Sequence, residues 1–152
     1  MFIPFEAFIE SVEERKIYFL AGNPPDNLIS DHLHICLKKP DGSLLYMMCC
    51  TSQIEKVQKF IETRSLPFST MVYLPSDDNN ALKKDTCVNC NNVHICSENE
   101  FKNYYNTNSV KFVGKISEGQ FKQILQGIID STLIEQDIKD VVLEILNFNY
   151  LD

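Results

Sequence analysis

The spacing of apolar residues predicts a short helix, then a series of strands, then one or two helices. Between Pro4 and Glu14, apolar side chains recur at i, i+3, i+4 and i+7, which is typical of a helix. From Lys16 onward the pattern changes to short apolar runs separated by turn-forming residues, which indicates strands. These runs are KIYFLAG, HLHICLKK, LLYMMCCTS, TMVYL and DTCVNCNNVHIC.

The segment HLHICLKK has the alternation of a half-buried strand. Leucine and isoleucine alternate with histidine and cysteine, so one face is expected to be buried and the other to face solvent. The following PDGS is a strong turn signal, and LLYMMCCTS is then the returning strand of a hairpin. The two strand ends farthest from this turn are expected to lie on the same side of the sheet. After the hairpin, QIEKVQKFIETR has helical spacing and predicts a short helix.

The C-terminal part carries two helix-start signals. Ser117 and Gln120 have the spacing of a capping box, and an apolar face at helical spacing follows them. Thr132 and Glu135 repeat the signal ahead of a second apolar face that ends near Ile145. The order of elements therefore predicts an α+β fold, mainly β with flanking helices, built on a small, strongly bent antiparallel sheet or barrel.

Length and composition indicate one globular domain over residues 1–152. The chain has 152 residues, 44% of them hydrophobic and 23% charged, with no internal repeat and no linker rich in Gly, Ser or Pro. The apolar runs are far shorter than the roughly 20 residues of a membrane span. The N-terminus has neither a basic segment nor a small-residue cleavage site. We therefore expect a cytoplasmic protein with no membrane partner.

The charge balance argues against a protein that coats nucleic acid. The net charge is −7 and the isoelectric point is near 4.9, whereas phosphate binding without sequence preference needs clustered cations. A local basic groove is still compatible with this balance. Arg15 and Arg64 are the two arginines, so most phosphate contacts would have to come from lysine, histidine or backbone N–H groups.

The stretch CVNCNNVHIC, Cys87 to Cys96, has the letters of a zinc site. Zinc needs four ligands that converge tetrahedrally. In a strand, however, Cys87 and Cys90 point to opposite faces, and residues on one face lie about 6–7 Å apart. We therefore predict no metal, no cofactor, and six reduced, mostly buried thiols. A zinc-dependent binding protein is the alternative interpretation of this stretch.

Three segments, in order, resemble the MazF/PemK family of bacterial toxins. They are YMMCCTS (46–52), ALKKDTCVNCNNVHICSENEF (81–101) and VGKISEGQFKQILQGI (113–128). The resemblance covers residues 16–130 and leaves 131–152 as an added C-terminal helix. It implies an SH3-like barrel and a metal-independent endoribonuclease of a toxin–antitoxin system. It also implies a homodimer that binds an RNA substrate and is inhibited by a protein or RNA antitoxin.

This resemblance also suggests which residues carry the chemistry. Metal-free RNA cleavage needs a group that takes the proton of the 2′-hydroxyl, and groups that stabilise charge on the phosphate. The family segments place Thr51 and Ser52 at one strand end and His32 at the start of the neighbouring strand, where the family usually has an arginine. These three are the predicted catalytic residues, because histidine can act as acid or base near neutral pH. The predicted RNA-binding residues are Lys83, Lys84, Asn91, Asn92 and His94.

The same residues also have purely structural interpretations. His32 can be a solvent-facing strand residue, and Thr51 or Ser52 can cap the helix that begins near Gln53. A second function is then a non-catalytic protein-interaction module on the same barrel. The apolar stripe over residues 138–146 would supply its contact surface.

Overall fold

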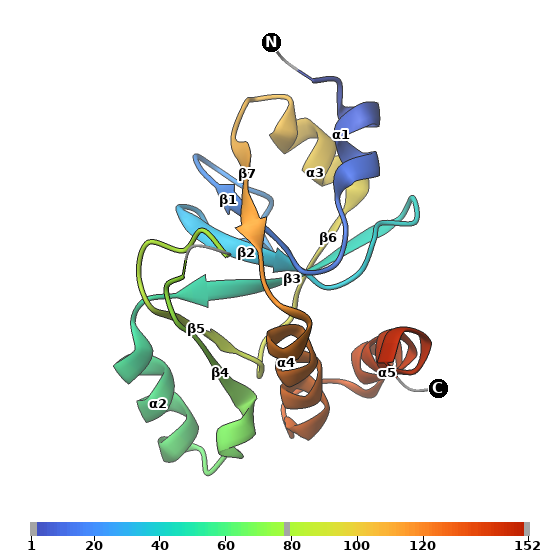
Figure 1. The fold of residues 1–152 in the computed structure, drawn as a ribbon. Helices are drawn as coiled ribbons and strands as arrows, with labels where there is room; N and C mark the ends of the chain where they lie inside the picture. Colours follow the sequence, from blue (N-terminus) through green and yellow to red (C-terminus); the bar gives the residue numbers. More distant parts are fainter. Residues whose placement is uncertain (1–2, 78–79, 151–152) are drawn as a thin grey trace.

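The computed structural model describes residues 3–77 and 80–150 and shows an α+β fold (Figure 1). The strands are β1 (Lys16–Leu20), β2 (His32–Cys36), β3 (Leu44–Thr51), β4 (Met71–Leu74), β5 (Thr86–Asn89), β6 (His94–Ser97) and β7 (Val110–Lys115). The helices are α1 (Phe5–Ser11), α2 (Ile54–Thr63), α3 (Glu98–Tyr105), α4 (Glu118–Asp130) and α5 (Gln136–Tyr150), with a 3₁₀ turn η1 (Phe68–Thr70). None of the helices in these ranges is long and apolar enough to cross a membrane.

The seven strands form one antiparallel sheet in the order β4-β5-β3-β2-β1-β7, with β6 also paired to β3. The long strand β3 pairs with β2 along one edge and with both β6 and β5 along the other. Strands β4 and β7 lie at the two ends of this order and do not pair with each other in the described ranges. The α+β class is therefore confirmed, but the sheet is not closed, and the predicted SH3-like barrel is not confirmed.

The sheet is buried on both faces. Ile17, Ile35 and other residues of one face pack with α4 and α5, whereas Tyr18, Cys36 and their neighbours pack with α1 and α3 on the other face. Figure 1 shows these two pairs of helices on opposite sides of the sheet. The expectation that β2 is half-buried is therefore wrong, since His34 and Cys36 are both fully covered. The physical reason is that α1 and α3 cover the second face.

The predicted start of α4 is confirmed in detail. The Ser117 hydroxyl accepts a hydrogen bond from the Gln120 N–H at 3.1 Å, and the Gln120 side chain accepts one from the Ser117 N–H at 3.0 Å. The matching signal at Thr132 does not start a helix, because α5 begins at Gln136. Ser131 explains the difference: its buried hydroxyl is bonded into the connection between the helices, where it accepts the Leu133 N–H.

Helix α5 contributes to the main core. Val142 is 1% exposed and Ile145 is 6% exposed, and both belong to the same apolar cluster as α4 and the sheet. Part of the apolar stripe over residues 138–146 is thus used inside the molecule. This leaves less of it for the partner contact that the interaction-module alternative requires.

Two elements were missed by sequence reasoning. Helix α3 begins with its own capping box, in which the Ser97 hydroxyl accepts the Glu100 N–H at 3.1 Å. Its Ser-x-x-Glu signal was present but lay inside the segment interpreted as one family motif. Strand β7 pairs with β1 through the register Phe19–Lys111 and Leu20–Val110. Its sequence VKFVGK is short and carries two lysines, so its alternation alone is a weak strand signal.

The stretch CVNCNNVHIC is two strands and not one. The pairs Cys50–Val88 and Met47–His94 both belong to β3, yet two β3 residues (48–49) lie between them against five (89–93) on the other side. The three extra residues interrupt the pairing and separate β5 from β6. The prediction of one continuous strand is therefore wrong, and the inserted residues form a turn that contacts α4.

The contact between α4 and this turn predicts a sharp difference between two glycines of the same helix. A Cβ added at Gly127 would lie 2.7 Å from the Ser69 carbonyl oxygen and 2.8 Å from the Cys90 sulfur, whereas one at Gly119 would meet only open space and a distant hydroxyl. We expect Gly127→Ala to lower the free energy of unfolding by about 1–3 kcal/mol because of overpacking. Gly119→Ala should leave it unchanged or raise it by up to about 1 kcal/mol. Urea denaturation measures both, and equal effects would contradict the close packing at Gly127.

Candidate functional site

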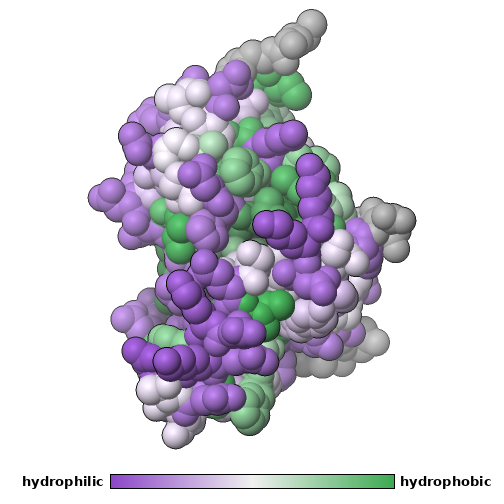
Figure 2. Space-filling view, turned by 90° about the vertical axis from the view of Figure 1, so that its left-hand side faces the viewer, coloured by the Kyte–Doolittle hydropathy of each residue, from purple (hydrophilic) through white to green (hydrophobic). Residues whose placement is uncertain are grey.

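A cavity of about 660 Å³ opens beside the ends of β2 and β3, and we call it the site cavity. One row of its lining crosses the sheet, with Phe19 paired to Lys111 on β7 and to Leu33 on β2. The polar residues around it include Asp31, His32, Thr51, Ser52, Lys83 and Lys84. Five of the eight predicted site residues are thus brought together from three separate segments of the chain. Figure 2 shows the side of the molecule that faces left in Figure 1, where hydrophilic side chains surround smaller hydrophobic patches.

His32 is half-buried at the start of β2, with one ring nitrogen already engaged. Its Nδ1 lies 2.8 Å from the Ser30 carbonyl oxygen, which is an acceptor, so we assign the ring proton to Nδ1. This leaves the Nε2 lone pair to accept a proton from a ligand. The preceding residue, Asp31, adopts the left-handed conformation with φ 59°, which turns the chain into the strand at this point.

The loop that precedes His32 is held by two other histidines. The His94 Nδ1 lies 2.9 Å from the Asn27 carbonyl oxygen, and the Ile29 N–H donates to the His34 Nε2 at 3.3 Å. Burial, with a smaller effect of neighbouring His94, lowers the pKa of His34 to about 4. Burial also lowers the pKa of His94. Both rings are therefore neutral at neutral pH, and the structure places His94 as a support of the loop and away from the site cavity.

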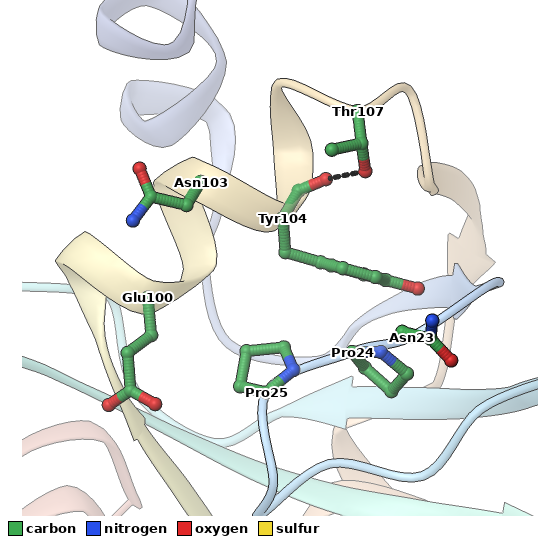
Figure 3. A pocket seen from close by; sticks show the side chains of 7 residues that line it. All are labelled: Asn23, Pro24, Pro25, Glu100, Asn103, Tyr104 and Thr107. Carbon is green, nitrogen blue, oxygen red and sulfur yellow. Dashed lines mark hydrogen bonds between the residues drawn. The ribbon is translucent and has the colours of Figure 1, made fainter.

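The first part of the same loop rests on α3. The Tyr104 hydroxyl donates to the Ala21 carbonyl oxygen. Figure 3 shows the Tyr104 ring beside Pro24 and Pro25, at a second cavity of about 540 Å³ between the loop and α3. No predicted site residue lines this second cavity. The contacts with α3 therefore fix the position of the first part of the β1–β2 loop, ahead of His32.

Thr51 and Ser52 differ in their surroundings. The Thr51 hydroxyl accepts the Gln53 N–H at 3.1 Å, just before α2, and the Gln53 side chain makes no cap of its own. Thr51 therefore has the local structural role that was one of its two interpretations. Ser52 is exposed and lines the site cavity, so its hydroxyl is the more available of the two for a ligand.

The β4–β5 loop presents Lys83 and Lys84 to the site cavity from a braced conformation. Asp85 accepts hydrogen bonds from the Tyr73 hydroxyl at 2.7 Å and from the Ser76 N–H at 2.8 Å. The Asn80 side chain, which is buried, ties the loop further by accepting the Leu82 N–H at 2.9 Å and donating to the Pro75 carbonyl oxygen at 3.1 Å. The described residues 80–85, which include the two lysines, are therefore organised in advance of any ligand.

The site cavity is positively charged although the chain is acidic. Lys83, Lys84 and Lys111 line it, are exposed, and form no ion pair with any described residue. Asp31 is the single acidic side chain among the described residues of the lining, so three positive and one negative charge give a formal charge of +2. The whole chain carries −7. The site cavity, where the predicted site residues meet, is thus a locally positive region of an acidic protein.

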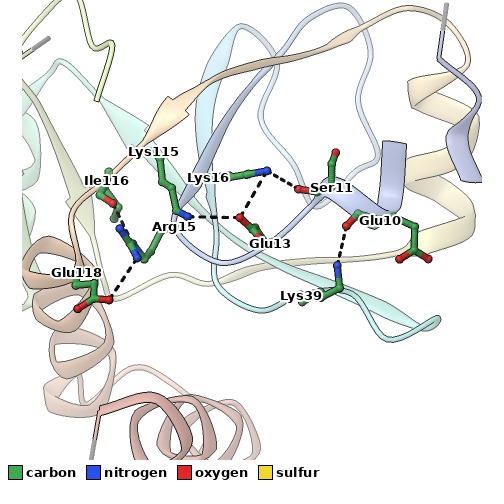
Figure 4. Close-up of polar contacts among 9 residues, drawn as sticks. All are labelled: Glu10, Ser11, Glu13, Arg15, Lys16, Lys39, Lys115, Ile116 and Glu118. Atoms are coloured by element: carbon green, nitrogen blue, oxygen red, sulfur yellow. Dashed lines mark hydrogen bonds and ion pairs between the residues drawn. The ribbon is translucent and has the colours of Figure 1, made fainter. Parts of the chain in front are cut away.

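Neither arginine contributes to this charge. Figure 4 shows Arg15 at the start of α4, where its Nε donates to the Ile116 carbonyl oxygen at 3.1 Å and its guanidinium lies 3.6 Å from Glu118. Arg64 lies over the Phe60 ring, 4.1 Å from the ring centre. Neither side chain lines the site cavity. The cationic side chains that line the site cavity are therefore lysines and not arginines.

Asn91 and Asn92 lie in the turn between β5 and β6, outside the site cavity. Asn91 is 7% exposed, and its side chain accepts a hydrogen bond from the Ser131 hydroxyl at 2.6 Å and donates to Asn89 at 2.9 Å. It links the sheet to the end of α4 and is not available to an RNA base. Asn92 is exposed but does not line the site cavity. The predicted RNA-binding group is thus divided, with its two lysines in the site and its other three members elsewhere.

Sequence reasoning missed three lining residues that matter to the chemistry. Lys111 comes from β7, where the weak alternation in VKFVGK could have suggested a strand but not its pairing with β1. Phe19 lay in a predicted strand, but its strand partners could not be known. Thr86 begins β5, and its hydroxyl is buried with no hydrogen-bond partner among the described residues.

The cysteines of CVNCNNVHIC do not form a metal site. Cys87, Cys90 and Cys96 belong to three different apolar clusters, and no group of three His, Cys, Asp or Glu residues in the described ranges is placed to hold a metal ion. Burial raises the pKa of Cys87 to about 11 and that of Cys96 to about 12, and it raises the pKa of Cys90 as well. These thiols are therefore protonated packing groups near neutral pH.

Comparisons with models of known protein families and with curated proteins found no match to this chain. The resemblance to MazF/PemK toxins therefore depends on the three sequence segments alone.

The buried thiols predict that the folded protein resists thiol reagents. We expect almost no labelling of the six cysteines by a disulfide reagent at pH 8 within minutes, because even half-buried Cys49 has a pKa raised by burial to about 12. All six should react once denaturant is added. Rapid labelling of Cys87 or Cys90 in the folded chain would contradict the burial.

The burial of the thiols also predicts how stability depends on pH. The free energy of unfolding should fall as pH rises above about 9, since unfolded thiols release protons that folded ones keep.

Proposed function

We propose that the protein is a metal-independent endoribonuclease that cleaves single-stranded RNA as the toxin of a toxin–antitoxin system. The observation that carries this proposal is that His32, Ser52 and the pair Lys83–Lys84 line one cavity although they come from three distant segments. The β2–β3 hairpin accounts for the meeting of His32 and Ser52, but it does not account for the two lysines of the β4–β5 loop beside them. Joint action on one phosphodiester accounts for all four residues.

The proposed reaction needs only the substrate and the side chains of the cavity. His32 Nε2 takes the proton of the ribose 2′-hydroxyl, and the 2′-oxygen attacks the adjacent phosphorus. The new P–O2′ bond forms as the P–O5′ bond breaks, which leaves a 2′,3′-cyclic phosphate. The leaving 5′-oxygen receives a proton from a lysine ammonium group of the β4–β5 loop. Lys83 and Lys84 also stabilise the extra negative charge on the phosphate oxygens in the transition state.

Three further features support single-stranded RNA as the substrate. Phe19 is a half-buried aromatic residue in the cavity lining, and a base that is free of pairing can stack on such a ring for about 1–3 kcal/mol. Lys111 lies directly opposite Phe19 on β7, where it can contact the phosphate next to a stacked base. The formal charge of +2 around the cavity attracts the RNA backbone locally, whereas the net charge of −7 disfavours general coating.

The finer fold is proposed from the strand pairing, and the partners are proposed from the family resemblance. We infer that the bent sheet is an open relative of the SH3-like barrel, because β3 is shared by β2, β5 and β6 in the manner of a strand at a barrel corner. A homodimer, a cytoplasmic location and an antitoxin that blocks the site follow from the resemblance to MazF/PemK toxins.

His32 provides the first test of this proposal. His32→Ala should lower the turnover number for a single-stranded RNA by about 10²–10⁴-fold, because the general base is lost. The affinity for the RNA should change by less than about threefold, since the lysines hold the phosphates. Gel-based cleavage assays and fluorescence anisotropy measure the two quantities. Unchanged turnover would contradict the role of His32, and a wild-type protein that neither cleaves RNA nor arrests growth would contradict the function itself.

The lysines provide an independent test through salt dependence. Lys83→Met and Lys111→Met should each reduce the slope of log affinity against log salt by about 0.7, the value for one contact with a single-stranded phosphate. Lys59→Met is the matched control, because Lys59 is an exposed lysine of α2 that does not line the site cavity. It should leave the slope unchanged. Equal slopes for all three variants would place RNA binding elsewhere on the protein.

A further inference from the structure

Thr86 has a buried hydroxyl group that forms no hydrogen bond within the part of the chain that the structure describes. The residue is 6% exposed, it lines the site cavity, and its Oγ1 has no hydrogen-bond partner among the described residues. Buried polar groups are nearly always paired, because an unpaired one forfeits the hydrogen bonds that it makes with water in the unfolded chain. An unpaired hydroxyl in a cavity lining therefore points to a partner that comes from outside the chain.

The strand register places this hydroxyl on the inner face of β5. Thr86 and Val88 lie two residues apart and thus share a face, and Val88 packs in the main core opposite Cys50. The β3–β5 pairing has its last observed pair at Thr51–Cys87, and continuing it by one residue brings Ser52 opposite Thr86. Ser52 and Thr86 therefore lie on the same face of the sheet, and both line the site cavity next to the loop that carries Lys84.

Two other buried hydroxyls have protein partners, whereas the Tyr18 hydroxyl, which does not line the site cavity, is buried without a partner among the described residues. The Thr70 hydroxyl, at 0% exposure, donates to the Pro67 carbonyl oxygen at 2.6 Å, and the buried Ser131 hydroxyl donates to Asn91 at 2.6 Å. Unlike Tyr18, Thr86 lines a cavity with an excess of positive charge. A ligand group that suits both a hydroxyl donor and nearby ammonium groups is an anionic oxygen acceptor.

We propose that Thr86 is a phosphate-binding residue whose hydroxyl donates a hydrogen bond to a non-bridging phosphate oxygen of bound RNA. The inference rests on the proposed function, and it identifies a ligand contact that neither the family segments nor the charge pattern suggested. Thr86 takes no part in proton transfer. It holds the phosphate in place, together with Ser52 and the lysines, while His32 acts on the 2′-hydroxyl.

Variants at Thr86 test this role, with Thr70 as a matched control. Thr86→Val removes the hydroxyl and keeps the shape of the side chain, whereas Thr86→Ser keeps the hydroxyl and removes the methyl group. Thr70→Val removes a hydroxyl that already has a protein partner. The probe is a fluorescently labelled, mixed-sequence oligonucleotide with 2′-fluoro groups, which has no 2′-hydroxyl and is not cleaved. Affinity is measured by anisotropy at several salt concentrations, and the melting temperature Tm is measured for each variant without ligand.

Thr86→Val should weaken binding of the probe about tenfold, as expected for a hydrogen bond to a charged acceptor. The salt slope should stay unchanged, because no charge is removed. Thr86→Ser should bind within about threefold of the wild type. The Tm of Thr86→Val should be unchanged or higher by about 2–4 °C, because an unpaired hydroxyl is removed, whereas Thr70→Val should melt lower by a similar amount.

Two results would overturn the inference while leaving the proposed function intact. One is wild-type affinity in Thr86→Val when the wild type binds the probe and cleaves RNA. The other is a Tm for Thr86→Val that falls as that of Thr70→Val does, which would show that the hydroxyl has a structural partner. A wild-type protein that neither binds the probe nor cleaves RNA would instead remove the proposed function and this inference together.

Discussion

Strand β3 pairs with β5 and with β6 in two registers that differ by three residues. The rest of the structure depends on this pairing. The extra residues between β5 and β6 end one ladder and start another, so the sheet bends along β3. The β4–β5 loop is thereby brought against β7 on the far side of the sheet. A side chain at Gly114 of β7 would overlap the Asn80 backbone. The site cavity lies between these two approaching parts, and its lysines come from both of them.

The inserted turn is stabilised by contacts that explain the residues of CVNCNNVHIC. The Cys90 N–H donates to the Thr70 carbonyl oxygen at 2.7 Å, and the Cys90 side chain packs against Gly127 of α4. Asn91 bonds to Ser131 at the end of the same helix. Sulfur and amide groups that resemble metal ligands or base contacts in the sequence therefore serve to dock α4 on the sheet. Their chemistry is that of small buried groups with satisfied hydrogen bonds.

The cationic side chains of the site cavity and of the region around Arg15 form two groups, which differ in whether they have partners within the protein. Arg15, Lys16 and Lys115 are engaged in local ion pairs or carbonyl contacts between the end of α1 and the start of α4 (Figure 4). The lysines of the site cavity have no such partners among the described residues. Because exposed pairs contribute little stability, the difference matters mainly for binding, since an unpaired lysine has its full charge available to a phosphate.

Local signals determined much of this protein before any tertiary contact was known. The hairpin turn at residues 40–43 placed His32 and Ser52 at the same end of two neighbouring strands, and the capping box at Ser117 began α4 as expected. The places of Lys111, Thr86 and Asn91 were decided only by the tertiary structure. The strand break after β5 and the coverage of both sheet faces depend on helices that are distant in sequence, and the edge pairing of β7 depends on the equally distant strand β1. Side-chain periodicity shows that two faces exist, but only packing decides what covers each of them.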